Sequence, residues 1–93
     1  MPKFIVVHVP FPTPLSPEQA APLLKRLAGS MTAEAYWVAS WCQADAEGKV
    51  VKASCRWDAT SLEAVRAAAA KLLPEMPVET VYPLVTIDSG DFR

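Results

Sequence analysis

The segment EAYWVASWCQADAEGKVVKASCRW, residues 34–57, contains two runs of aromatic, β-branched and small residues separated by Asp45-Ala46-Glu47-Gly48. Two such runs around a turn-forming cluster predict a β-hairpin. If the four turn residues stay unpaired, Ala44 faces Lys49. One face of the sheet then carries Ala35, Trp37, Ala39 and Trp41 with Val50, Lys52, Ser54 and Arg56. A change of one residue in loop length would alter this register.

Two helices are predicted on either side of the hairpin. Ser16-Pro17-Glu18-Gln19 combines a capping box with proline at the first helical position, and the following pattern predicts a helix to about Ala28. Pro22 is expected to kink it. Thr60-Ser61-Leu62-Glu63 is a second capping box, followed by an alanine-rich stretch with apolar residues at helical spacing up to Pro74.

The first and last strands are predicted at Lys3–Val9 and Glu79–Asp88, the latter interrupted by Pro83, which favours an edge position or a bulge. The order strand, helix, strand, strand, helix, strand predicts a single α+β domain over residues 1–93, a ferredoxin-like βαββαβ sandwich. Both helices then cover one side of the sheet. Because the other side would expose Trp37 and Trp41, we expect a homodimer of the dimeric α/β-barrel type.

Composition excludes several classes of partner. Nine basic and ten acidic residues give a net charge of −1, so nucleic-acid binding lacks its main electrostatic driving force. The apolar start Phe4–Val7 is interrupted by His8 and predicts a strand, not a signal peptide. No apolar run approaches the roughly 18 residues of a membrane span. We therefore expect a cytoplasmic protein with no membrane partner.

His8 and the two cysteines are the candidate reactive groups. His8 is the only histidine, and its interpretations are a metal ligand, a general base, or a polar residue at a strand end. Cys42 and Cys55 share a face in the predicted register but lie about four positions apart, or roughly 13 Å, which is too far for a disulfide. Both are expected to behave as small apolar residues. No nucleotide-binding or hydrolase motif occurs.

The aromatic residues allow two interpretations. Tryptophans of the hairpin could line a pocket for a flat ligand with polar anchors on the neighbouring strand, or they could pack in a dimer interface. The pocket interpretation uses Trp37, Trp41 and Trp57. The residues expected at the ligand pocket or dimer face are Trp37, Trp41, Lys52, Ser54, Arg56 and Tyr82.

The chain resembles a known protein family in several short motifs: WVAS at 37–40, KASCRW at 52–57, DATSLEAVR at 58–66 and MPKFIV at 1–6. It is a family of small ferredoxin-like proteins of unknown function, one branch of which is nickel-binding or nickel-responsive. The resemblance implies a homodimer and permits a divalent metal such as nickel, with His8 and Cys55 as candidate ligands. The chain departs from the family in its proline-rich loop at 10–17, in Cys42 and in Pro83.

Two functional hypotheses follow. The first is a non-enzymatic homodimeric module that binds a divalent metal or a small ligand. The alternative is a small cofactor-free enzyme of the dimeric α/β-barrel type, similar to monooxygenases or isomerases, which rests on fold analogy alone. That alternative needs an enclosed cavity beside His8, Tyr36 or Tyr82. A third possibility is an interaction domain whose second sheet face only forms the dimer.

Overall fold

All four predicted strands and both predicted helices occur. The computed structural model describes the whole chain, residues 1–93. Its elements are β1 Lys3–His8, α1 Pro17–Gly29, β2 Ala35–Ala44, β3 Val50–Ala59, α2 Leu62–Ala70, β4 Val78–Pro83 and a short 3-10 helix, η1, Ser89–Phe92. The strands form one antiparallel sheet in the order β2-β3-β1-β4. The α+β class is thereby confirmed.

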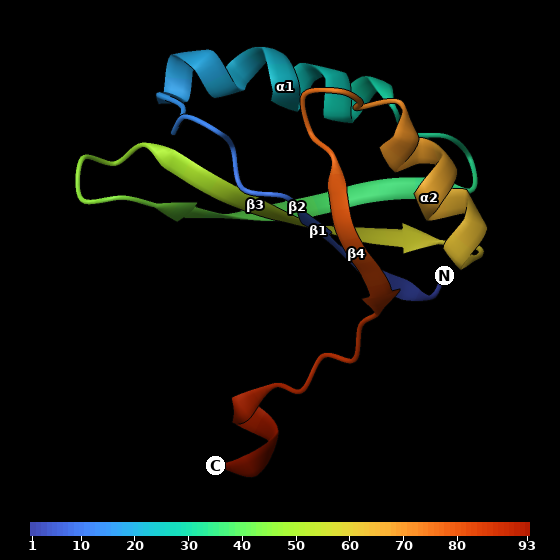
Figure 1. Cartoon of the computed structure of the whole chain (residues 1–93). Coiled ribbons are helices and arrows are strands. Elements are labelled where there is room, and N and C mark those ends of the chain that lie inside the picture. The colour runs from blue at the N-terminus through green and yellow to red at the C-terminus, as the bar shows by residue number, and fades with distance from the viewer.

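The helices and the C-terminal segment lie on opposite sides of the sheet. Figure 1 shows α1 and α2 above the strands, whereas the chain after β4 runs away below them. The helix side therefore forms the core, and the face below, which we call the outer face, has no helix over it. None of the helices has the length and apolar character needed to span a bilayer.

Local capping explains where the helices begin. The Ser16 hydroxyl accepts a hydrogen bond from the Gln19 backbone at 3.2 Å, and the Gln19 side chain accepts one from the Ser16 backbone at 2.9 Å, which confirms the first capping box. The N-cap of α2 is Ser61, not Thr60 as predicted. α2 also ends earlier than predicted, at Ala70. Residues 71–75, which include Pro74, form turns.

The hairpin loop is tighter than predicted. The Asp45 backbone donates to Lys49 O at 2.9 Å, so Ala44 faces Val50 instead of Lys49. The Asp45 carboxylate accepts from the backbone of Glu47 and Lys49, and Gly48 has a φ of +79°. A three-residue loop that ends in a left-handed glycine is a common hairpin connection. The register also shifts between Gln43, which faces Lys52, and Ala44, so the predicted pairing is wrong along the hairpin. The two shifts together move β2 by two positions, which leaves Trp41 on its predicted face.

A second irregularity changes which tryptophan faces the core. The register shifts between Trp37 and Ala39, so Val38 is an extra residue in β2. A β-bulge of this kind reverses the facing of every side chain before it. Trp37 therefore lies on the helix side opposite Trp57 and packs against the core, whereas Tyr36 takes its place on the outer face. The prediction for Trp37 is wrong for this reason.

The last strand is shorter than predicted, since β4 ends at Pro83 instead of Asp88. Proline has no backbone N–H to continue the ladder, and β4 forms one edge of the sheet, as its proline suggested.

The core lies between the helices and the sheet. Its buried residues are Phe4, Val6, Leu27, Ala35, Ala53, Cys55, Trp57, Ala59, Val65, Ala68, Ala69, Leu72 and Met76. Arg26 holds α1 against the end of α2: its guanidinium donates to Lys71 O and Leu73 O and pairs with Glu75. These bonds satisfy carbonyls that a helix end leaves free.

Candidate functional site

The outer face carries five of the six predicted face residues, all except Trp37, and two of the five are exposed aromatic residues. Trp41 faces Ser54, Arg56 faces Ile5, and Ile5 faces Tyr82 across the strands. Directly opposed residues of an antiparallel sheet point to the same side. Trp41 and Tyr82 are 58% and 46% exposed. Tyr36, which is 55% exposed, lies on β2 with Trp41, so exposed aromatic rings stand at both edges of this face.

The same face mixes charges of both signs. Lys52 Nζ lies 2.9 Å from Glu79 Oε2, and Arg56 Nη2 lies 3.5 Å from Asp58 Oδ1. The second pair is near enough for Coulomb attraction but is not aligned as a hydrogen bond. As a result, Arg56 Nε and Asp58 Oδ1 are both buried without a hydrogen-bond partner. A buried polar atom without a partner is costly. Both atoms are inaccessible to solvent, so they mark a cost of this packing and are not contact points for an incoming group.

A groove separates the outer face from the C-terminal segment. It has a volume of about 400 Å³ and is lined by Ile5, Trp41 and Arg56 on the sheet and by residues 84–87 on the other wall. Within this segment Val85 and Ile87 are 81% and 72% exposed. The ligand pocket predicted from the tryptophans thus retains only Trp41 and Arg56.

The other two tryptophans belong to the helix side. Trp57 is completely buried, and its Nε1 has no hydrogen-bond partner. Trp37 Nε1 donates to Ser40 Oγ at 3.0 Å, and the Ser40 hydroxyl donates to Cys55 Sγ at 3.1 Å. These two hydrogen bonds satisfy the hydroxyl of Ser40, a polar residue among apolar neighbours. Because both indoles lie on the helix side, neither is available to a ligand on the outer face.

His8 is a buried core residue, not an exposed strand end. It is 1% exposed, and its Nδ1 lies 3.1 Å from Met76 O. A carbonyl only accepts, so Nδ1 carries the proton and Nε2, which is buried without a partner, is the unprotonated nitrogen. Burial lowers the pKa of His8 below its ordinary value, although hydrogen bonds to the Met76 and Pro77 backbone oppose the shift. The imidazole is therefore held neutral.

The two cysteines differ in environment. Cys42 is exposed and Cys55 is completely buried, and both are free thiols. Cys42 faces Ala53, so the two cysteines lie two positions apart along the ladder instead of the predicted four. Burial raises the pKa of the Cys55 thiol to about 11, against the opposing hydrogen bond from Ser40. Cys55 is accordingly a poor thiolate donor at neutral pH.

These environments do not suit a divalent metal. No group of three or more His, Cys, Asp or Glu side chains is close enough to hold an ion. His8 and Cys55 are both buried and have no third ligand beside them. The residues present therefore do not form a site for nickel or a similar ion at His8 and Cys55.

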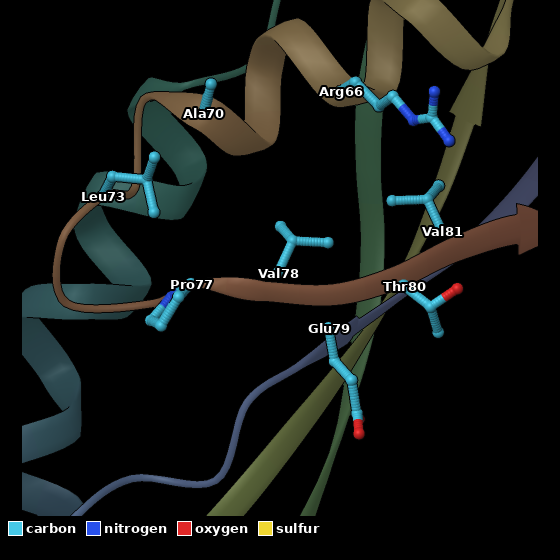
Figure 2. A pocket seen from close by; sticks show the side chains of 8 residues that line it. All are labelled: Arg66, Ala70, Leu73, Pro77, Val78, Glu79, Thr80 and Val81. Carbon is cyan, nitrogen blue, oxygen red and sulfur yellow. The ribbon is translucent and has the colours of Figure 1, made fainter.

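A second groove was not predicted from the sequence. It lies between α2 and β4, has a volume of about 500 Å³, and is lined by Arg66, Ala70, Leu73, Pro77, Val78, Glu79, Thr80 and Val81 (Figure 2). The signal in the sequence was the run of alanines at 67–70, which places no large side chain above β4. None of the three pockets of the chain is lined by His8, Tyr36 or Tyr82. The enzyme hypothesis therefore gains no support from the single chain.

No protein-family model, curated protein or solved structure matches the chain. The resemblance to the ferredoxin-like family with a nickel branch therefore stays a prediction.

Proposed function

We propose that the protein is a homodimeric binding module of the ferredoxin-like type, in which the outer faces of two sheets meet. The strand order β2-β3-β1-β4 with antiparallel pairing, and the presence of both helices on one side, support the fold assignment. In this arrangement the second layer of the sandwich is the helices, and the outer face needs a separate cover.

The exposed aromatic surface is the observation that carries the proposal. Tyr36 and Trp41 from β2 and Tyr82 from β4 are each about half exposed on one face. Trp and Tyr are enriched in protein interfaces, where they contribute most of the binding energy. Exposed aromatic rings at both edges of one sheet face, with Ile5 and polar side chains between them, favour association with a partner that covers the whole face.

The charges of the outer face suit a second copy of the same chain. A two-fold interface brings each surface patch against itself. A patch of one sign would repel its copy, but this face holds Lys52 and Arg56 together with Asp58 and Glu79. A two-fold rotation can therefore bring the cations of one copy near the carboxylates of the other.

The proposed dimer does not restore the predicted metal site. His8 and Cys55 are in the layer between the sheet and the helices. A partner on the outer face would lie on the other side of the sheet and would supply no ligand to either residue. The ligand site of the proposed module therefore lies away from His8 and Cys55.

Light scattering coupled to size-exclusion chromatography tests the proposal. The expected mass at high concentration is twice the 10.1 kDa of the chain, with a fall toward the chain mass on dilution. The indole fluorescence of the dimer should be blue-shifted relative to the diluted sample, because Trp41 would lose contact with water. A mass of one chain at every concentration would rule out the homodimer.

A further inference from the structure

The groove between α2 and β4 has the dimensions of a small-molecule site. Its volume is about 500 Å³, and such sites typically measure about 300–1,000 Å³. Figure 2 shows Val78 and Val81 pointing from β4 toward α2, with the Arg66 side chain above Val81. Glu79 and Thr80 point to the other side of the strand. The floor of the groove is therefore apolar, and a cation stands at one end.

The composition of α2 is the reason that the groove stays open. Residues 67–70 are all alanine, so this end of the helix presents only methyl groups beside β4. Val78 and Val81 are only partly buried although they pack against the core, and Leu73 is 50% exposed. An apolar ligand in this groove would bury these side chains, which makes the free energy of binding more favourable.

The electrostatics of the groove favour an anion. Arg66 takes part in none of the ion pairs of the chain. The other charged lining residue, Glu79, has its carboxylate 2.9 Å from Lys52 Nζ on the opposite side of the sheet. β4 is also an edge strand, so one side of its backbone has no strand partner and adds free N–H donors.

From these observations we infer that the α2–β4 groove binds a small carboxylate with an apolar body, such as a medium-chain fatty acid. The carboxylate pairs with the planar guanidinium of Arg66, a geometry that allows two parallel hydrogen bonds. The hydrocarbon chain lies over Val78 and Val81 and ends against Leu73. The inference rests on the proposed function, since it names the ligand of the binding module, but the groove lies on the helix side, away from the outer face.

Titration of octanoate into the ¹⁵N-labelled full-length chain, followed by amide chemical shifts, tests the inference. Saturable shifts are expected at Arg66, Ala70 and residues 78–81. Octylamine has the same chain length and the opposite charge, so its affinity should be at least about tenfold lower, because it cannot accept from Arg66. No saturable shift with octanoate, or equal affinity for the two compounds, would overturn the inference.

Two pairs of variants at exposed positions separate charge from shape. Arg66→Gln should weaken octanoate binding at least about tenfold, whereas Lys25→Gln, which removes an exposed cation on α1, should not. Ala70→Phe should fill the groove and abolish binding. Ala67→Phe adds the same ring to α2 outside the groove and should leave binding intact. Unchanged affinity in both Arg66→Gln and Ala70→Phe would place the ligand elsewhere.

The failure of this inference is distinguishable from the failure of the dimer. The mass measured by light scattering depends on the outer face, and the octanoate shifts depend on the groove. A monomeric chain that still binds octanoate through Arg66 would contradict the proposed dimer and support the groove. A dimer that binds no octanoate would do the reverse.

Discussion

Replacement of Trp41 by serine removes the largest exposed apolar side chain of the outer face. The tryptophan is 58% exposed, and a large aromatic side chain buries about 200 Å² when fully covered, so a dimer would cover about 120 Å² more of it. At about 25 cal/mol per Å² this amounts to about 3 kcal/mol for each tryptophan. A symmetric dimer contains two, so the upper limit is about 6 kcal/mol, or a factor of about 10⁴ in the dimer dissociation constant.

Because coverage in an interface is incomplete and part of the gain offsets ordering of side chains, we expect Trp41→Ser to raise the dissociation constant at least about 100-fold. Sedimentation equilibrium over a dilution series measures the constant directly. Leu24→Ser is the matched control, since Leu24 is 41% exposed but lies on α1, on the helix side. A Trp41→Ser variant with the wild-type dissociation constant would show that the outer face does not form the interface.

Other predictions concern the buried groups and the hairpin. Burial lowers the pKa of His8 below 6.5, so the unfolded state takes up the proton first as the pH falls. The free energy of unfolding should therefore fall by up to about 1.4 kcal/mol per pH unit below pH 6.5. Urea titrations at several pH values should show this pH dependence in the wild type and not in His8→Gln, and an equal pH dependence in both would contradict the assignment. Cys42 should react with a thiol reagent in the native protein and Cys55 only in denaturant, with rapid native labelling of both as the contrary result. Gly48→Ala should cost about 1–2 kcal/mol from its left-handed backbone alone, because no atom lies near the added Cβ; Gly29→Ala, which also has open space and no such φ, should cost less, and equal melting temperatures would be inconsistent with the turn. Adding Ni²⁺ to the metal-free protein should shift the melting temperature of neither the wild type nor His8→Ala, since no three His, Cys, Asp or Glu side chains lie close together. A shift in the wild type alone would establish His8 as a metal ligand.

Local signals in the chain were sufficient for the elements of the fold. The Ser16 capping box acts within four residues, and the structure retains it. The proline at Pro83 ends β4 because a residue without a backbone N–H cannot extend the ladder. Strand, helix and turn preferences of this kind depend on neighbours in sequence, so they could be predicted without any knowledge of the tertiary structure.

Facing and burial depended on longer-range geometry. The bulge at Val38 has no sequence signal of its own, yet it moves Trp37 to the core and Tyr36 to the outer face. His8 looked like a polar strand end, but the packing of residues around Met76 buries it completely. The α2–β4 groove combines residues far apart in sequence, and its opening depends on where the alanines of α2 lie over β4.

The amino-acid sequence alone was enough to predict six secondary-structure elements, their order and the α+β class, because capping, turn residues and periodicity act over a few residues. The pairing register, the identity of the outward aromatic rings, the buried state of His8 and the hollow beside Arg66 came from three-dimensional packing. A single inserted residue in a strand, or a short side chain in a helix, changes these features without altering the local preferences that a sequence expresses.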